Sequence, residues 1–324
     1  MTAWLDALDD AARDLVAPGP PPTGKAAMKA VLTDERFSDA AWIFERKLDG
    51  IRCIAVRDGA PVRLFSRNDL SLDGRYPELA AALAEVPRER FAIDGEVVAF
   101  ERGRTSFARL AQRGQRRVHV FLYVFDILWL DGCDVRPLPL LARKRLLRSE
   151  LTFADGVRLT PYRRKDGEAL FAEACRKGWE GLIAKRADSV YSDRRSRDWL
   201  KMKCEQGQEL VIGGFTAPQG SRTELGALLL GVYDGDRLRY AGKVGTGFDR
   251  ATLRDLGARL RALRRDDPPF ADAAAIKERG VTWVEPELVA QVGFTEWTGA
   301  GRLRHPRFLG LRDDKAATEV VRER

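Results

Sequence analysis

The chain has 324 residues, of which 56 are basic and 48 acidic, giving a formal net charge of +8. A hydrophobic fraction of 44% is enough to bury a core in each of two domains, so the sequence is that of a folded protein. No apolar run approaches the roughly 20 residues that span a bilayer, and the N-terminus lacks a secretory signal pattern, which argues against membrane and secreted classes.

The first expected elements are an amphipathic helix near residues 4–16 and then a stiff linker at Pro18-Gly19-Pro20-Pro21-Pro22, where the proline rings fix the backbone. We expect the compact fold to begin beyond this linker. Apolar alternation and helical spacing then predict an α+β domain with antiparallel sheets and flanking helices. Its expected strands are 42–46, 51–57, 62–66, 91–100, 118–130, 157–162, 182–186 and 199–203, and its expected helices are 76–86, 140–151 and 167–179.

The pattern changes after residue 205. Strands are expected at 210–216, 225–233, 237–244 and within 282–297, with a strongly basic helix at 250–265. Four or five strands with one helix predict a small C-terminal β-barrel of the OB-fold type, which often binds nucleic acids. The expected division is therefore 1–25 for the helix and linker, 26–205 for the first domain and 206–324 for the second.

The four cysteines, Cys53, Cys133, Cys175 and Cys204, lie far apart in the sequence and form no C-x-x-C pair. They predict neither a zinc site nor a disulfide framework, and small buried thiols in a reduced cytoplasm are the simplest expectation. Only two histidines are present, so histidine-based metal sites and a Ser-His-Asp triad are poor candidates for the chemistry.

Charged residues interrupt apolar or glycine-punctuated strands in three places, which costs free energy unless the charges are paired or used. These segments are 45–52 (Glu-Arg-Lys-Leu-Asp-Gly-Ile-Arg), 93–98 (Ile-Asp-Gly-Glu-Val-Val) and 180–186 (Glu-Gly-Leu-Ile-Ala-Lys-Arg), the last followed by 199–203 (Trp-Leu-Lys-Met-Lys). Plain structural alternatives are an Asp-Gly turn with an exposed lysine, a β-bulge at Gly95, and an edge strand with Lys201 and Lys203 facing solvent. Alternatively, lysines and carboxylates from several strands meet at one site that handles a nucleotide.

In order and spacing, these segments resemble the motifs of covalent nucleotidyltransferases, and most closely those of ATP-dependent DNA ligases. Within that family the resemblance is greatest to the ligase domain of bacterial non-homologous end-joining ligases, over residues 26–324. It implies a nucleotidyltransferase (adenylation) domain followed by an OB-fold domain. It also implies that the protein seals nicks or breaks in duplex DNA through a lysyl-AMP and a DNA-adenylate, with ATP and Mg²⁺ or Mn²⁺ as cofactors, in repair by end joining.

The resemblance also implies roles for single residues. Lys47 would attack the α-phosphorus of ATP, and we expect neighbouring cations and a dry pocket to lower its pKa from about 10.4. Glu45 would lie against the adenine and Phe125 would stack on it, although a core aromatic is the alternative for Phe125. The other implied contacts are Arg52 and Arg67 with the nucleotide and the 5′-phosphate, Glu96 and Glu180 with ribose and a divalent metal, Lys185, Lys201 and Lys203 with the α-phosphate, Trp199 as a wall of the pocket, and Arg312 and Lys315 with the pyrophosphate.

Lysine is scarce, since the basic residues comprise 44 arginines and 12 lysines. Five of those twelve lysines occupy motif positions, where arginine could not replace the nucleophile because its guanidinium does not readily lose a proton.

The implied partner is nicked or broken duplex DNA, which suits the basic runs at 102–117 and 194–203, although a solvated basic surface is the alternative. By analogy the family adds a bacterial Ku end-binding protein or a separate repair polymerase or nuclease. A monomer at the bacterial nucleoid in the cytoplasm, without a membrane partner, is expected. Two rival functions remain: another covalent nucleotidyltransferase, such as an RNA ligase or a capping guanylyltransferase, and a non-catalytic OB-fold protein that binds nucleic acid.

Overall fold

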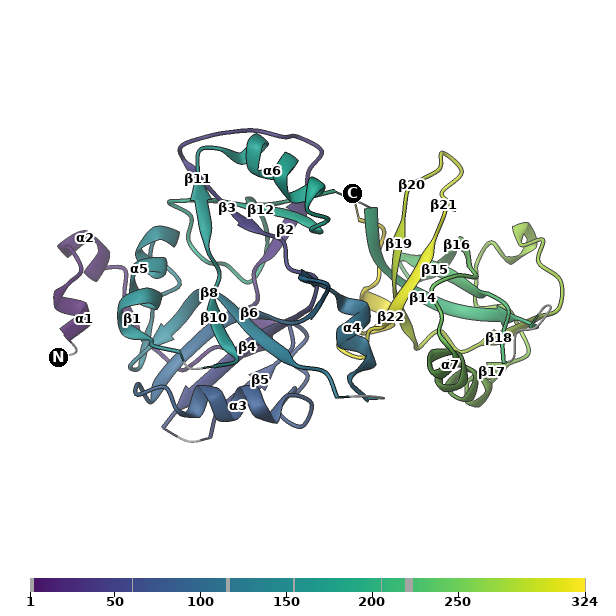
Figure 1. Ribbon diagram of the computed structural model, residues 1–324, viewed down its shortest axis with the longest axis horizontal. Helices are drawn as coiled ribbons and strands as arrows, with labels where there is room; N and C mark the ends of the chain where they lie inside the picture. The colour runs from purple at the N-terminus through teal and green to yellow at the C-terminus, as the bar shows by residue number, and fades with distance from the viewer. Residues whose placement is uncertain are drawn as a thin grey trace. The chain divides into compact units, whose positions relative to one another are not determined.

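The computed structural model describes residues 3–59, 61–114, 117–153, 155–204, 206–218 and 224–323 (Figure 1). The chain forms two compact units, one containing the residues up to Leu110 together with Val118–Cys204, the other containing Ala111–Arg117 and the residues from Glu205 onward. Glu205 at the expected boundary and Arg116 of the first basic run lie outside the described residues. No helix in the described part of the chain is long and apolar enough to cross a membrane.

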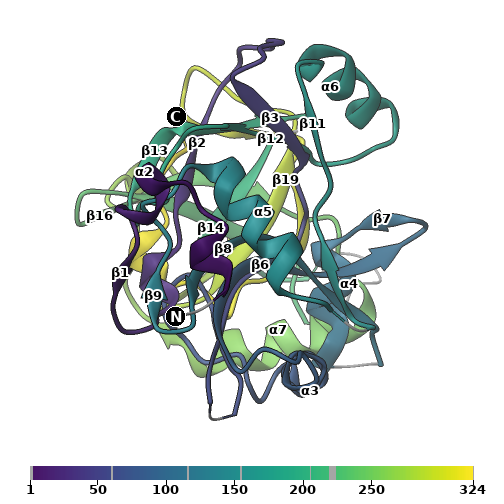
Figure 2. The same ribbon diagram turned by 90° about the vertical axis from the view of Figure 1, so that its left-hand side faces the viewer.

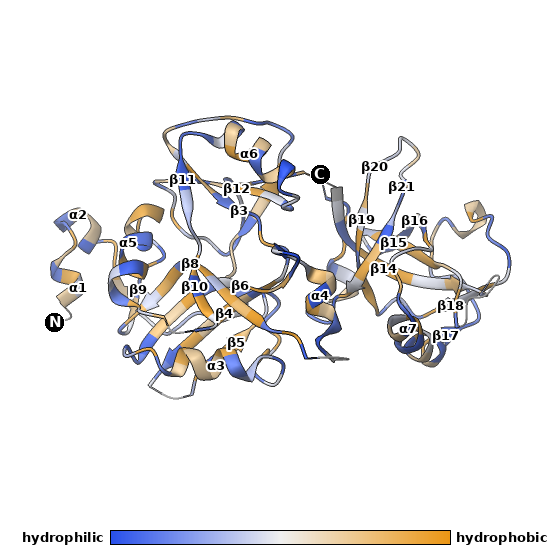
Figure 3. Cartoon of the chain, in the orientation of Figure 1, coloured by the Kyte–Doolittle hydropathy of each residue, from blue (hydrophilic) through white to orange (hydrophobic). Residues whose placement is uncertain are grey.

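The first unit contains an eight-stranded sheet in the order β1-β9-β8-β6-β4-β5, with β7 paired to β6 and β10 to β8. The strands β8 and β6 are largely hydrophobic (Figure 3), and most of their residues are buried. Helices α3 and α5 pack on β8, and Figure 2 shows α5 beside this strand. The bounds are β1 Ala17–Pro18, β4 Ile51–Asp58, β5 Arg63–Phe65, β6 Arg90–Glu101, β7 Arg104–Thr105, β8 Val120–Leu130, β9 Cys133–Asp134, β10 Val157–Leu159, α3 Pro77–Ala84 and α5 Leu140–Glu150.

A five-stranded sheet in the order β11-β3-β12-β13-β2 forms the rest of the first unit, with helix α6 packed on β3 and β12. A buried cluster joins the two sheets, since it contains Phe125 and Trp129 from the larger sheet and Trp199 from the smaller. The bounds are η1 Gly24–Ala26, β2 Lys29–Leu32, β3 Trp42–Arg46, α4 Phe107–Ala111, β11 Tyr162–Arg164, α6 Gly167–Arg176, β12 Gly181–Arg186 and β13 Arg195–Lys203. The short helix η2 (Gln112–Gly114), which follows α4, belongs to the second unit.

The expected α+β class with mainly antiparallel sheets is confirmed, with two parallel pairings, β10 with β8 and β13 with β2. The single strand expected at 157–162 is wrong, because the chain leaves the larger sheet after Leu159 and enters the smaller one at Tyr162. Pro161 between them has no N–H to donate to a ladder. β13 lies between β12 and β2, so the edge-strand alternative for Lys201 and Lys203 is also wrong.

The second unit is organised around the long strand β14, which pairs with β15 and also with β18 and β19. This pairing and the single long helix α7 agree with the expected OB-type domain. Asp249 caps α7 by accepting a hydrogen bond from Thr252 N at 2.8 Å, and Leu253, Leu256 and Leu260 bury one face of the helix. The bounds are β14 Gln206–Thr216, β15 Leu228–Asp234, β16 Arg237–Val244, α7 Arg250–Ala262, β17 Arg264–Arg265, η3 Ala273–Ala275, β18 Val281–Val284, β19 Val289–Phe294, β20 Glu296–Trp297, β21 Leu303–Arg304, β22 Arg307–Leu311 and η4 Ala317–Glu319.

The N-terminal segment differs from expectation. Instead of one helix it forms α1 (Ala3–Asp6) and α2 (Asp10–Arg13), because Asp9 caps the second helix by accepting from Ala12 N at 2.8 Å.

This segment is also packed on the first unit rather than lying outside it. Trp4 is buried and its Nε1 donates to Asp131 Oδ2 at 3.1 Å, β1 pairs with β9, and Trp129 Nε1 donates to Gly19 O at 2.7 Å. The proline-rich run therefore begins within the larger sheet, since Pro18 is the last residue of β1.

The expectation for the cysteines is partly wrong. Cys175 and Cys204 form a disulfide that joins the C-terminal end of α6 to the residue after β13. Cys53 is buried as a free thiol, as expected, whereas Cys133 is half-buried. The pair is separated by 29 residues, and only the packing of α6 on the smaller sheet brings the two sulfurs together.

We predict that Trp4→Ala lowers the free energy of unfolding by about 3 kcal/mol, because it removes a buried indole and leaves Asp131 without that donor. Urea denaturation followed by circular dichroism measures this. Leu15→Ala, at a residue that is 44% exposed, is the matched control and should change stability by less than about 0.5 kcal/mol. Equal effects of the two substitutions would show that the N-terminal segment is not part of the cooperative unit.

Candidate active site

Lys47 lies on the connection that leads from β3 in the smaller sheet to β4 in the larger one. Its backbone N donates to Gly181 O at 2.9 Å, and Asp49 Oδ2 accepts from Phe107 N at 2.8 Å. A side chain at Gly50 would place its Cβ 2.1 Å from Val97 O, so only glycine fits there. Because β3 and β4 belong to different sheets and the Lys47 side chain is only 19% exposed, the alternative of an Asp-Gly hairpin turn with an exposed lysine is wrong.

The ammonium of Lys47 is held by an acid. Its Nζ lies 2.6 Å from Glu180 Oε1, while Glu180 Oε2 is buried without a hydrogen-bond partner among the described residues. Burial acts to lower the pKa of Lys47, but Glu180, and after it Glu96 and Asp49, outweigh burial and raise the pKa above its ordinary value. The expectation that neighbouring cations lower this pKa is therefore wrong for the protein without a nucleotide.

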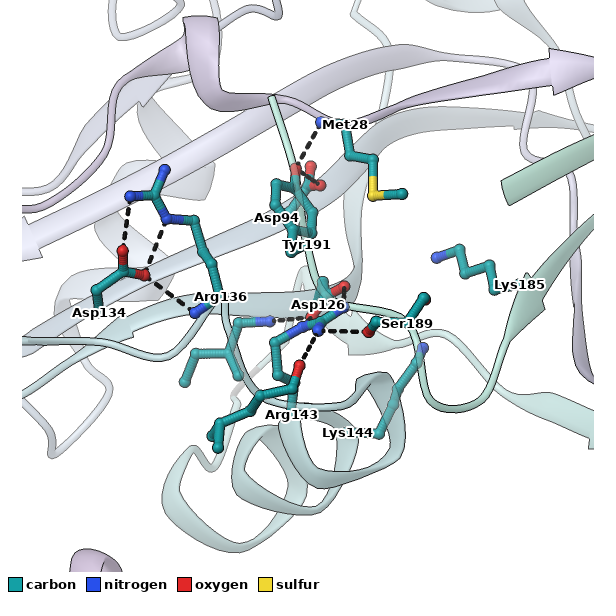
Figure 4. A network of polar contacts seen from close by, with 12 residues as sticks. Met28, Asp94, Asp126, Asp134, Arg136, Arg143, Lys144, Lys185, Ser189 and Tyr191 are labelled. Atoms are coloured by element: carbon teal, nitrogen blue, oxygen red, sulfur yellow. Dashed lines mark hydrogen bonds and ion pairs between the residues drawn. The ribbon is translucent and has the colours of Figure 1, made fainter. Parts of the chain in front are cut away.

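Arg52 on β4 is fixed by the buried carboxylate of Asp94, which accepts from Nε and Nη2 at 2.5 Å each. Asp94 also accepts from the hydroxyl of Tyr191 at 2.6 Å, and this hydroxyl accepts from Met28 N at 2.9 Å (Figure 4). Burial opposes the charge of Arg52, but Asp94 outweighs it, so the pKa of Arg52 lies above its ordinary value. Arg52 stands opposite Glu96 on β6, which is half-buried.

Two aromatic rings lie beside these cations. Phe125 on β8 and Trp199 on β13 are buried, with ring centroids 6.1 Å apart in an edge-to-face arrangement. The Nζ of Lys185 lies 4.2 Å from the Phe125 centroid and 3.9 Å from the Trp199 centroid, and the guanidinium carbon of Arg52 lies 4.7 Å from that of Phe125. Phe125 is thus a core aromatic that also touches two of the predicted site cations.

Glu45 on β3 is buried between two lysines. Lys185 Nζ lies 2.7 Å from Glu45 Oε2, and Lys144 Nζ contacts Oε1. Burial lowers the pKa of Lys185 to about 8; Lys144 acts in the same direction, whereas Glu45 and Asp126 act against it.

Three further predicted residues lie on the same two sheets or at their ends. Arg67 is half-buried in the turn after β5, where buried Ser66 Oγ accepts from Leu70 N at 3.2 Å. Lys201 and Lys203 follow Trp199 at alternate positions on β13, opposite Ile183 and Gly181 of β12.

The β-bulge expected near Gly95 is present as a register shift between Asp94 and Gly95.

Arg312 and Lys315 form a cluster within the second unit. Arg312 donates to both oxygens of buried Asp314 at 2.8 Å, and Lys315 Nζ lies 3.2 Å from Glu209 Oε2. Arg312 also lies 3.8 Å from Glu209 Oε1, so Glu209 on β14 joins the two basic residues.

Sequence reasoning missed a buried ion pair between β8 and α5 that lies next to the site. Arg143 and Asp126 form a fully buried bidentate ion pair at 2.8 and 3.0 Å, and Arg143 also donates to Ser189 O (Figure 4). A signal was available, because Arg143 and Lys144 lie three and four positions after Leu140, on the face that α5 buries. Charges on a buried helix face require partners.

The carboxylates near Lys47 fit part of a divalent-metal site. Glu180 offers an unpartnered buried oxygen, and Glu96 acts on the same lysine. Among the described residues no three His, Cys, Asp or Glu side chains form a metal cage, so two carboxylates would leave coordination positions for water and phosphate, as Mg²⁺ prefers.

Comparisons with known proteins agree with this architecture. The family descriptions "ATP dependent DNA ligase domain" and "ATP dependent DNA ligase C terminal region" match residues 25–203 and 221–315. The chain is 40% identical over 292 residues to the multifunctional non-homologous end joining protein LigD of Pseudomonas aeruginosa, covering 87% of this chain and 35% of that protein. It is also 40% identical over 288 residues to the LigD of Mycobacterium tuberculosis, covering 87% of this chain and 37% of the relative.

The chain thus spans little more than a third of the length of these curated relatives. A solved structure of mycobacterial DNA ligase D complexed with ATP and MES matches with a TM-score of 0.65 and 36% identity, covering 92% of this chain and 99% of that one. The expected fold class, a nucleotidyltransferase domain followed by a C-terminal domain, is confirmed by these matches. The chain therefore belongs to the ATP-dependent DNA ligase family.

Proposed function

We propose that this chain seals nicks or breaks in duplex DNA at the cost of ATP, with Lys47 as the residue that becomes adenylated. The observation that carries the proposal is the position of Lys47, whose backbone N donates to Gly181 and whose ammonium contacts Glu180, both at the start of β12. Arg52 and Lys185 share the aromatic pair Phe125 and Trp199 in the same unit. Displacement at phosphorus spreads negative charge over oxygens, and a fixed nucleophile with fixed cations serves that chemistry.

In the proposed first step, Lys47 Nζ loses a proton, for which Glu180 Oε1 at 2.6 Å is the acceptor in place. The lone pair of the neutral amine then forms a P–N bond to the α-phosphorus of ATP while the P–O bond to pyrophosphate breaks, and the nitrogen gives up a second proton to water. A 5′-phosphate oxygen of the DNA then attacks the same phosphorus, and Lys47 leaves with its proton restored. Finally the 3′-hydroxyl oxygen forms a P–O bond to the DNA 5′-phosphorus and loses its proton to water, while the P–O bond between that phosphorus and AMP breaks, which seals the strand and releases AMP.

The other roles implied by the motifs are part of the proposal. Glu45 and Phe125 would contact the adenine, Trp199 would wall its site, and Arg52 and Arg67 would contact the nucleotide and the 5′-phosphate. The lysines at 185, 201 and 203 would neutralise phosphate charge. Glu96 and Glu180 would contact the ribose and hold Mg²⁺ or Mn²⁺, which would supply further positive charge at the phosphates when bound.

We also propose that the reaction serves DNA repair by end joining at the bacterial nucleoid in the cytoplasm, with the protein acting as a monomer. The names of the LigD relatives support this context. A Ku end-binding protein and a separate polymerase or nuclease are the partners that this context implies. The described arginines Arg102, Arg104, Arg117 and Arg194 are exposed, as contact with a DNA backbone requires.

We predict that the wild-type protein forms one covalent AMP adduct with labelled ATP, whereas Lys47→Ala forms none because no other residue supplies the nucleophile. Mass mapping of the modified peptide measures this. The exposed lysine variant Lys25→Ala is the control and should form the adduct normally. Label from GTP alone would favour a capping guanylyltransferase, adduct formation with sealing of RNA ends only would favour an RNA ligase, and no adduct would favour a non-catalytic OB-fold protein.

The affinity for ATP should depend on pH through Lys185. Its pKa of about 8 means that the free protein loses this charge above pH 8, while contact with phosphate requires the ammonium form. Binding must then take up a proton, so the dissociation constant for ATP should rise about tenfold per pH unit above pH 8. Calorimetric titration of Lys47→Ala, which should bind ATP without reacting, measures this dissociation constant. Adding Lys185→Arg should remove the break, that is, the change of slope near pH 8 in the plot of the dissociation constant against pH. A break that persists in that variant would contradict the role of Lys185.

We predict that Lys315→Ala slows self-adenylation about 100-fold, because it removes a charge proposed to orient the pyrophosphate leaving group. Such a role needs the second unit to approach the nucleotide during this step and to withdraw later. Sealing of a pre-adenylated nick releases no pyrophosphate and should change by less than about threefold. Lys277→Ala, at an exposed lysine of the same unit, is the control for both assays. Equal losses in the two assays would count against the role.

A further inference from the structure

Helix α5 carries two consecutive charged residues on its buried side. Arg143 is fully buried and is satisfied by Asp126, the residue after Phe125. Lys144 is 7% exposed and contacts Glu45 Oε1, with its Nζ 5.5 Å from the centroid of the Tyr162 ring (Figure 4 shows both basic residues on the helix). Neither side chain reaches the surface, so a DNA contact does not account for them.

The position of Lys144 makes Glu45 a carboxylate with two cations. Lys144 contacts one oxygen and Lys185 lies 2.7 Å from the other, so this group of three residues has one positive charge in excess when both lysines are protonated. Lys185 also lies against the Phe125 and Trp199 rings, whereas Lys144 extends from helix α5, which packs on β8. Of the two, only Lys185 is placed near the predicted nucleotide-binding aromatics.

A phosphate group that attracts Lys185 would have to take it from Glu45. If Lys185 were the only counter-ion, its departure would leave a buried carboxylate without charge compensation, which is strongly unfavourable. With Lys144 in place, Glu45 keeps a partner and its position on β3 after Lys185 has moved.

We propose that Lys144 is a positioning residue for nucleotide binding: it is the permanent counter-ion of Glu45, and thereby releases Lys185 to the phosphates of ATP. The inference rests on the proposed function and deepens it by dividing the two lysines into one fixed and one exchangeable cation. Lysine suits the position because a single compact ammonium fits between Glu45 and the Tyr162 ring, where the planar fork of arginine is broader. The neighbouring basic residues of α5 are all arginine.

The test is the ATP dependence of self-adenylation in single turnovers. Lys144→Met should raise the half-saturating ATP concentration about tenfold or more, because Lys185 is then retained by Glu45, and should leave the maximal rate within about threefold. Lys144→Arg, which keeps the charge but carries a broader group, should recover only part of the affinity. Arg145→Met, at an exposed position on the same helix, is the matched control and should behave as wild type.

A double-mutant cycle with Glu45→Gln separates this role from simple packing. Once residue 45 is neutral it no longer retains Lys185, so adding Lys144→Met should change the half-saturating ATP concentration by less than about twofold. The proposal would be overturned if the two substitutions raised the half-saturating ATP concentration independently, so that their fold-changes multiplied in the double variant. An unchanged ATP dependence in Lys144→Met would overturn it as well. If Lys144→Met alone fails to fold, the double variant, which removes the ion pair as a whole, is compared with Glu45→Gln. Failure of wild type to form any adduct would instead reject the proposed function.

Discussion

The site depends on how two adjacent residues at the start of β12 hold Lys47. Gly181 accepts a hydrogen bond from the Lys47 backbone through its carbonyl, and Glu180 binds the ammonium. Gly181 has a φ of +147°, and a Cβ there would lie 1.9 Å from Met202 O, so the residue after the glutamate must be glycine. Since β12 pairs with both β3 and β13, the register of the sheet fixes the position of Lys47, the proposed nucleophile.

A second constraint is that each buried carboxylate in this region needs a cation. Asp94 and Asp126 are fully buried, and each is bound through two oxygens by one arginine. These pairs contribute little net stability, but loss of either partner would leave an uncompensated charge in the core. They hold β4, β6, β8 and α5 around the aromatic residues, so the geometry near Phe125 follows from two ion pairs, of which only Arg52 has a proposed contact with the nucleotide.

The sequence was informative where local patterns decide the structure. Trp42–Arg46 and Arg237–Val244 have the bounds that alternation predicts. The ordered motifs lie close together in the fold, with Glu45, Lys185 and Trp199 on three adjacent strands and Lys47 directly after the first of them. It was uninformative where the outcome depends on contacts between distant segments. The Cys175–Cys204 disulfide, Trp4 on Asp131 and Lys144 on Glu45 each join residues whose proximity no local pattern specifies. The prediction of a lowered pKa for Lys47 failed for the same reason, because this pKa depends on which charges tertiary packing brings to the ammonium.

The preference for arginine acquires a physical meaning from these contacts. Arg52 and Arg143 bind carboxylates through two nitrogens each, a geometry that fixes the side chain and suits a scaffold. Lys47, Lys144 and Lys185 instead meet their acids through a single nitrogen. An ammonium with a single contact can exchange its acid for a phosphate oxygen or lose a proton. Loss of a proton is what the proposed nucleophile Lys47 would require, and the lowered pKa of Lys185 favours it there. The use of lysine in this site therefore fits the proposed roles, in which the charges of Lys47 and Lys185 react or move and the compact charge of Lys144 stays so that Lys185 can move.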